Sequence, residues 1–164
     1  VDSVEETARA VAYCKYPPVG HRSVMGVLPQ FGYKSVPVAE STTIANRETF
    51  VCVMLETPEA IAQADAIAAV PGLDAILIGT NDLCAEMGIH GYFGNDRVAD
   101  AYAKMIAACK AHNKFPGMAG IYNEAIMSRY VAMGARFILS GQDTNFMLAG
   151  AQSRTGALRK MHGG

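Results

Sequence analysis

The sequence lacks a surplus of either charge and contains no long apolar run. Its 14 Lys and Arg residues nearly balance 15 Asp and Glu residues, which leaves a net charge of −1. Binding to nucleic acid through a basic field needs a cationic surplus, so we expect no nucleic-acid partner. No apolar stretch approaches the ~20 residues that span a bilayer, and the first residues predict the start of a helix and no signal peptide. We therefore expect no membrane partner and a cytoplasmic location.

Cysteine is also scarce, and its spacing excludes the common zinc and redox motifs. Cys14, Cys52, Cys84 and Cys109 form no CxxC pair. We interpret them as buried free thiols in a reducing compartment. Cys84 lies two residues from Asp82 and could line a site, but nothing nearby predicts an activated nucleophile.

Length and apolar content predict one globular domain over residues 1–164. Of these residues 51% are hydrophobic and 18% are charged, a balance typical of folded chains. Four apolar runs, each followed by a helical pattern, predict the alternation of a parallel α/β fold: Phe50–Leu55, Ala75–Ile78, Pro116–Ile121 and Arg136–Leu139. An open doubly wound sheet is the alternative, but no glycine-rich phosphate fingerprint follows the first run.

Side chains that cap helices predict the helix boundaries. Ser3 and Glu6 form a capping box, and Asn95 and Asn123 are typical N-caps. Gly134 is a typical helix stop. The predicted helices are Glu5–Cys14, a weak one at Val36–Asn46, one over 57–68 capped by Thr57, Asn95 to about His112, Glu124–Met133, and one from Asp143 or Thr144 towards Met161, after which the last three residues fray.

Two acidic residues follow the first two predicted strands. Phe50–Leu55 is an unbroken apolar run, as expected of a strand buried on both faces, and it ends at Glu56. Ala75–Ile78 opens into a loop, 79–82, that ends at Asp82. The carboxyl ends of parallel strands are where α/β folds place their sites. Two hard oxygen ligands with open positions suit Mg²⁺ or Mn²⁺, and Co²⁺ is a third option.

A structural interpretation of the same residues remains open. Glu56 can be a solvated acid at a strand end, and Asp82 can be a helix cap. The small residues of Pro116–Ile121 indicate a close approach of backbone near a pocket.

The segments MLETPEA (54–60), AAVPGLDAILIGTNDL (68–83) and AEMG (85–88) resemble the HpcH/HpaI family of class II pyruvate aldolases. KYPPVGHRSV (15–24) is similar to the family's RYPP-G-RGVG stretch, with Ser23 where the family usually has Gly. The family's metal-binding Glu and Asp fall on Glu56 and Asp82. Where the family often has Pro-Ala, this chain has Thr80 and Asn81.

The resemblance implies that the chain is the C-terminal part of a TIM (β/α)₈ barrel. Such a barrel needs about 250 residues, and this chain matches about four βα units, without the N-terminal strands. We therefore expect a fragment. The family's catalytic His and substrate-binding Arg lie in the absent part, so no catalytic residue is assigned. A half-barrel exposes strand edges and an apolar face, which predicts a homo-oligomer or a complementing N-terminal half.

The resemblance also implies a reaction. A pyruvate unit binds the metal, and its carboxylate takes backbone N–H groups of Gly79, Thr80, Asn81 and Asp82. The expected activity is aldol or retro-aldol cleavage of 4-hydroxy-2-oxo acids through a pyruvate enolate. Alternatives are an oxaloacetate decarboxylase or macrophomate synthase-like enzyme, and a catalytically incomplete fragment that supplies metal ligands and an oligomer interface. A CoA-thioester lyase ranks lowest because no basic cluster suits CoA phosphates. The methionines of the tail (Met127, Met133, Met147 and Met161) are either interface or ordinary core.

Overall fold

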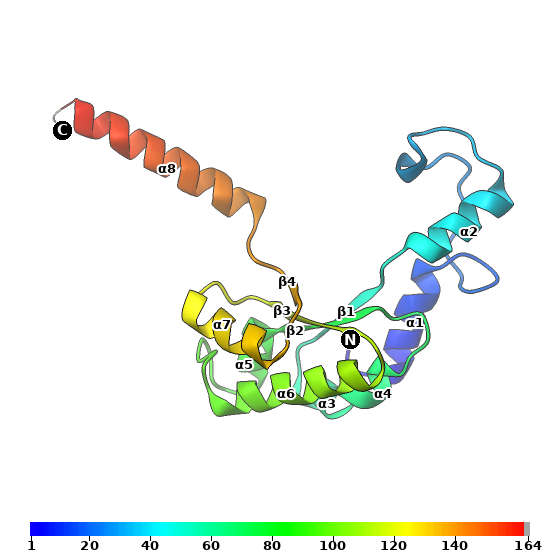
Figure 1. Ribbon diagram of the computed structural model, residues 1–164, viewed down its shortest axis with the longest axis horizontal. Coiled ribbons are helices and arrows are strands. Elements are labelled where there is room, and N and C mark those ends of the chain that lie inside the picture. The colour runs from blue at the N-terminus through cyan, green and yellow to red at the C-terminus, as the bar shows by residue number, and fades with distance from the viewer. Residues whose placement is uncertain (163–164) are drawn as a thin grey trace.

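The computed structural model describes residues 1–162 and is built on one parallel sheet with the strand order β1-β2-β3-β4 (Figure 1). All three neighbouring pairs are parallel, which confirms the predicted α/β alternation. Gly163 and Gly164, for which fraying is predicted, lie outside the described residues. The strands are β1 (Cys52–Leu55), β2 (Ala75–Gly79), β3 (Phe115–Ala119) and β4 (Phe137–Ile138).

One face of the sheet carries the hydrophobic core. Alternate strand residues such as Leu55, Ile76 and Ile78 have no exposed surface and pack against the helices. This alternation follows from the two-residue period of a strand. The helices that cover this face are α3 (Pro58–Ala62), α4 (Ala64–Ala68), α5 (Thr80–Glu86), α6 (Asp96–Ala111) and α7 (Glu124–Met133).

The other face is apolar as well but more open, which corrects the prediction for the first strand. The predicted run Phe50–Leu55 was expected to be buried on both faces, whereas β1 begins at Cys52 and alternates between half-buried and buried residues. Phe50 is 47% exposed and packs against Phe115 and Phe137, with ring centroids 6.0 and 5.4 Å apart. These rings and Arg136 line a hollow of about 270 Å³. The helices that contact the sheet lie on its other side, so β1 is covered on one face only.

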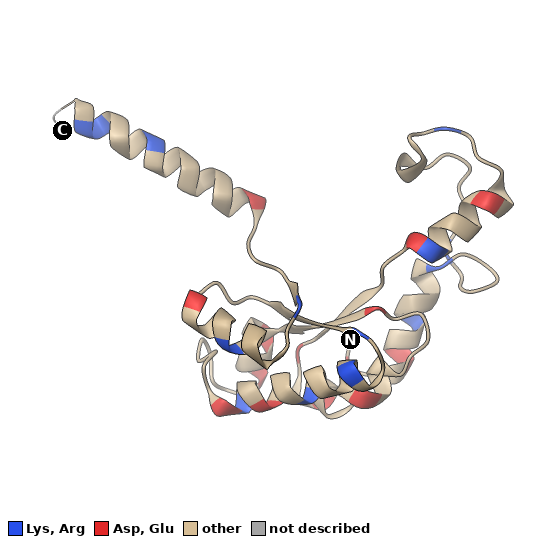
Figure 2. Ribbon diagram, in the orientation of Figure 1, with Lys and Arg blue, Asp and Glu red and all other residues tan. Residues whose placement is uncertain are grey.

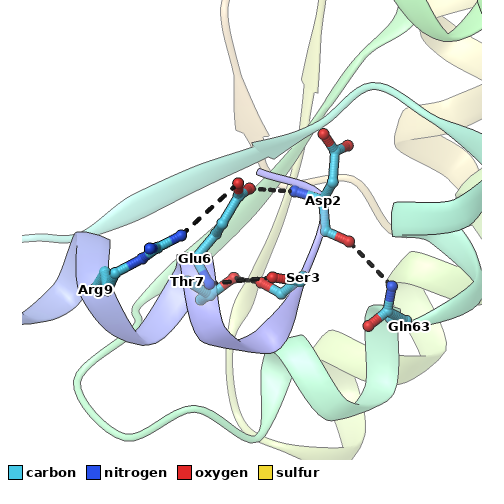
Figure 3. Close-up of polar contacts among 6 residues, drawn as sticks. All are labelled: Asp2, Ser3, Glu6, Thr7, Arg9 and Gln63. Atoms are coloured by element: carbon cyan, nitrogen blue, oxygen red, sulfur yellow. Dashed lines mark hydrogen bonds and ion pairs between the residues drawn. The ribbon is translucent and has the colours of Figure 1, made fainter.

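Hydrogen bonds near the first residues of the N-terminal helix α1 (Val4–Cys14) cap this helix and connect it to the rest of the protein (Figure 3). The Ser3 hydroxyl accepts a bond from the Glu6 N–H at 3.2 Å, as the capping box predicts. The Glu6 carboxylate accepts from the N–H of Asp2 at 2.8 Å, one residue earlier than the motif implies. Gln63, between α3 and α4, donates to the Asp2 carbonyl at 3.0 Å.

Several predicted boundaries are confirmed. Thr57, Asn95 and Asn123 each cap the N–H groups of their helix through the side chain, and Gly134 ends α7. The predicted helix over 57–68 is instead divided at Gln63 into α3 and α4. The weak helix α2 spans Val38–Glu48, and the irregular segment before it contains a short 3₁₀ helix, η1 (Pro29–Phe31).

The last helix, α8 (Asp143–Met161), extends away from the sheet and has no buried residue (Figure 1). Met147 and Met161 are 71% and 79% exposed, so the core interpretation of these two is wrong, whereas Met127 and Met133 pack against the core. Figure 2 shows one acidic position at the start of α8, which is Asp143, and basic positions towards its end, a distribution that interacts favourably with the helix dipole. Among residues 1–162, none of the helices combines the length and apolarity needed to cross a bilayer.

Candidate metal and 2-oxo acid site

The ends of β1 and β2 bring Glu56 beside Gly79. Leu55 and Ile78 are paired in register, so the residues that follow them lie next to each other at the same edge of the sheet. A Cβ atom on Gly79 would lie 2.6 Å from Oε1 and 2.7 Å from Cγ of Glu56. Gly79 has an ordinary φ of −79°. Glycine is therefore needed here for the close approach of the glutamate and not for backbone conformation.

The predicted loop 79–82 is the beginning of a helix, which corrects its assignment as a loop. α5 begins at Thr80, directly after the strand, and Gly79 is its N-cap residue, without a side-chain bond to the helix. Asp82 is the third residue of α5, in the first turn, where a carboxylate is favoured by the helix dipole. The direct transition from strand to helix turns Asp82 back towards the end of β1.

Glu56 and Asp82 are close enough for their carboxyl groups to interact directly. Partial burial raises the pKa of Glu56, and it is raised further because the protonated Glu56 carboxyl group donates a hydrogen bond to Asp82 and because Asp82 is negatively charged. Two carboxyl groups in contact cannot both ionise at low cost unless a cation lies between them. Their four oxygens are the hard ligands that Mg²⁺ and Mn²⁺ prefer. The donor set therefore fits a divalent cation that takes its remaining ligands from water or substrate.

No further protein ligand joins this pair in the part of the chain that the structure describes. Among residues 1–162, no group of three or more His, Cys, Asp or Glu side chains is arranged to hold a metal. The four cysteines are free, as predicted, but only Cys84 and Cys109 are buried, whereas Cys14 and Cys52 are partly exposed. Burial raises the pKa of the Cys84 thiol, so it has no activated thiolate despite its place near Asp82.

The Thr80 side chain turns away from the carboxylate pair and into the protein. It has no exposed surface. Its hydroxyl donates to the Ala119 carbonyl at 2.8 Å and lies 2.8 Å from the Tyr102 hydroxyl. The side chain of Thr80 therefore makes hydrogen bonds within the protein, and only its backbone N–H remains available to a ligand.

The Asn81 side chain connects α5 to the end of β3. Its amide donates to the Gly120 carbonyl at 3.3 Å. Gly120 has a φ of +81°, and a Cβ there would lie 2.5 Å from the Asn81 amide nitrogen. The small residues around Gly117 and Gly120 do permit the close backbone approach that the sequence predicted, since Gly117 likewise leaves no room for a Cβ beside Leu77.

Two further hollows in the described residues lie away from the Glu56–Asp82 pair. One of about 450 Å³ is bordered by Lys110, Lys114 and Arg136 near the start of β3 and β4. Lys114 and Arg136 donate there to the backbone carbonyls of Leu73, Val131 and Ala135. The other, of about 310 Å³, lies on the outer surface between α3, α5 and α6.

Comparison with known proteins gives a consistent result. The family model described as HpcH/HpaI aldolase/citrate lyase matches residues 1–149. A 4-hydroxy-4-methyl-2-oxoglutarate aldolase of Hapsidospora irregularis is 39% identical over 161 residues, which cover 96% of this chain and 60% of that protein. A 4-hydroxy-2-oxo-heptane-1,7-dioate aldolase of Salmonella typhimurium is 35% identical over 167 residues, which cover 99% of this chain and 62% of that protein.

Solved structures share the fold. The crystal structure of an HpcH/HpaI aldolase from Desulfitobacterium hafniense DCB-2 superposes with a TM-score of 0.81 at 30% identity, over 96% of this chain and 61% of that one. Macrophomate synthase superposes with a TM-score of 0.71 at 20% identity, over 100% of this chain and 58% of that one, a likeness of fold alone. The chain thus spans about 60% of the length of the relatives it matches.

Proposed function

Since the chain belongs to the HpcH/HpaI aldolase/citrate lyase family, we propose that the protein of which it forms part is a metal-dependent carbon–carbon lyase. Its reaction is retro-aldol cleavage of a 4-hydroxy-2-oxo acid. The bond between C3 and C4 breaks, the C4 hydroxyl loses its proton, C4 leaves as a carbonyl compound, and the electron pair stays on a pyruvate enolate that is then protonated to pyruvate. The observation that carries this proposal is the contact between Glu56 and Asp82, in a chain whose relatives are named aldolases.

Glu56 and Asp82 would hold the metal, Mg²⁺ or Mn²⁺, with Co²⁺ as a further option. When bound, the cation supplies Lewis-acid stabilisation of the negative charge that develops on the 2-oxo oxygen. Because Glu56 holds a proton more tightly than an ordinary carboxyl group, that proton competes with the cation, and we expect metal affinity to rise with pH.

The substrate carboxylate would bind at the first turn of α5. Gly79 provides no side-chain cap, so the backbone N–H groups of Thr80, Asn81 and Asp82 are available to an anionic group. Gly79 itself leaves the space into which the Glu56 side chain fits. These four residues, 79–82, form the proposed substrate contact. We assign no side chain of this chain as the general base.

The sheet would be the C-terminal part of a (β/α)₈ barrel. Two observations support this: the strands are all parallel in sequential order, and the face that carries Phe50, Phe115 and Phe137 is apolar and only partly covered. Further strands paired with the free edges of β1 and β4 would close the sheet into a barrel, and this face with its rings would then line the enclosed interior.

A homo-oligomer is proposed on the evidence of α8. This helix buries none of its residues on its own chain, yet it exposes Phe146, Met147 and Leu148 together near its start. Apolar side chains that find no partner on their own chain favour packing against a second copy.

The test is an assay of the complete protein for pyruvate release from both aldol substrates named for the relatives. Oxaloacetate serves as the comparison substrate, because a decarboxylase would prefer it. We expect turnover that depends on Mg²⁺ or Mn²⁺ and stops with a chelator. Glu56→Gln should lower kcat/KM and Mn²⁺ affinity at least about 100-fold. Glu59→Gln is the matched control, because Glu59 is an exposed acid in the first turn of α3.

Two outcomes would contradict the proposal. One is turnover that persists after metal removal, and the other is a Glu56→Gln variant that binds Mn²⁺ as well as the wild type. Faster turnover of oxaloacetate than of either aldol substrate would favour the decarboxylase alternative. A folded complete protein that binds Mn²⁺ but turns over none of these substrates would favour the catalytically incomplete alternative.

A further inference from the structure

Tyr102 joins the first turn of α5 to the middle of α6. It has no exposed surface, and its ring stacks on that of Tyr130 with centroids 4.0 Å apart. Its hydroxyl lies 2.8 Å from the hydroxyl of Thr80, the first residue of α5. Both groups are buried, so water cannot replace either partner if one is removed.

The direction of these hydrogen bonds is determined by the number of protons. The Thr80 hydroxyl has one proton, and it donates that proton to the Ala119 carbonyl. Thr80 must therefore accept from Tyr102. Burial raises the pKa of Tyr102 far above its usual range, so its hydroxyl keeps the proton that it donates. The hydrogen bonds therefore all point in one direction, from Tyr102 on α6 to Thr80 on α5 and from Thr80 to Ala119 at the end of β3.

Asn81 adds a second connection beside the first. Its amide donates to the carbonyl of Gly120, the residue after Ala119. Two consecutive residues of α5 are thus bonded to two consecutive carbonyls at the end of β3. The next residue of α5 is Asp82, which interacts with Glu56. Any rotation or shift of this first turn would change the distance between the two carboxylates.

We propose that Tyr102 and Thr80 are positioning residues, which hold the first turn of α5 so that the Asp82 carboxylate faces Glu56 at the spacing required by a divalent cation. This inference rests on the proposed function of the pair. It assigns to a buried tyrosine, remote from the carboxylates in sequence, a part in metal affinity. Groups that orient metal ligands typically change metal affinity or activity by about 10–100-fold when they are removed.

Tyr130 provides the matched control. Its side chain is as buried as that of Tyr102, and the rings of the two tyrosines stack on each other. Its hydroxyl, however, donates to the Phe93 carbonyl and not to α5. Removal of either hydroxyl should cost stability, but only the hydroxyl of Tyr102 should affect the metal site.

The experiment uses the complete protein and the variants Thr80→Val, Thr80→Ser, Tyr102→Phe and Tyr130→Phe. Mn²⁺ affinity is measured by electron paramagnetic resonance, KM and kcat by pyruvate release, and Tm by thermal unfolding. We expect Thr80→Val and Tyr102→Phe to weaken Mn²⁺ binding by about tenfold. Thr80→Ser keeps the hydroxyl and should bind Mn²⁺ like the wild type. Tyr130→Phe should lower Tm and leave Mn²⁺ affinity unchanged.

The outcomes separate this inference from the function on which it rests. A wild-type protein that neither binds Mn²⁺ nor releases pyruvate overturns the proposed function, and the positioning role is refuted with it. If the wild type binds Mn²⁺, but Thr80→Val and Tyr102→Phe match Tyr130→Phe in both affinity and Tm, the hydrogen bonds are merely structural and the positioning role is refuted alone. Should Thr80→Val fail to fold, Tyr102→Phe decides by the same criterion.

Discussion

The substitution Gly79→Ala should damage the proposed metal site while it leaves the fold intact. The added Cβ would lie 2.6 Å from Oε1 of Glu56, 2.7 Å from its Cγ and 2.9 Å from Sδ of Met54. Ordinary contact begins at 3.4 Å, so the carboxylate oxygen must retreat by about 0.8 Å, the difference between 3.4 and 2.6 Å. The backbone itself is unstrained, because φ is −79° at this position.

The neighbours that must move are the ends of flexible side chains, so the cost in folding free energy should stay within the ~1–3 kcal/mol typical of added core methyl groups. The cost to function should be larger, since a displacement of about 1 Å in a catalytic group can reduce the rate about 100-fold. We therefore expect a small fall in Tm, together with a fall in kcat/KM of about 100-fold and weaker Mn²⁺ binding.

The assays are pyruvate release, Mn²⁺ titration and thermal unfolding on the complete protein. Gly94→Ala is the matched control, because a Cβ at Gly94 meets no atom within 4 Å and the residue has no positive φ. A Gly79→Ala protein with wild-type Mn²⁺ affinity and wild-type kcat/KM would refute the argument, because it would show that the position of Glu56 does not matter.

Two further predictions concern the thiols and the last helix. Burial raises the pKa of Cys52 from 9.0 to about 11 and that of Cys109 from 9.0 to about 12. The folded state therefore holds these two protons more tightly than the unfolded chain does. Because of this difference, the free energy of unfolding should fall as pH rises from 9 towards 11. Urea unfolding under reducing conditions tests this, and Cys52→Ala and Cys109→Ala should each flatten the dependence. Removal of α8 should lower the melting temperature only through the loss of contacts with a second copy, because this helix buries no residue of its own chain. The same truncation should reduce the assembly size measured by light scattering, and an unchanged size would contradict the interface proposed for α8.

Much of the fold and the candidate site could be predicted from local signals. Caps such as Thr57, Asn95 and Asn123 depend on a side chain and the N–H groups two or three residues later, so the sequence alone locates them. The contact between Glu56 and Asp82 follows from two strands that are consecutive in sequence and parallel in space. Their role as metal ligands remains a prediction.

Other features were determined only by tertiary structure, because they depend on partners distant in the chain. Hydrophobic periodicity could not reveal that β1 is covered on one face only, since burial depends on which segments lie above each face. The bond between Thr80 and Tyr102 spans 22 residues, and no pattern in the sequence selects that partner. The sequence of α8 likewise predicts only an ordinary helix. The tertiary structure shows that its apolar residues have no packing partner on their own chain. Local chemistry thus determined the order of the strands and helices and several helix caps, whereas the way the helices pack on one side of the sheet determined which side chains meet.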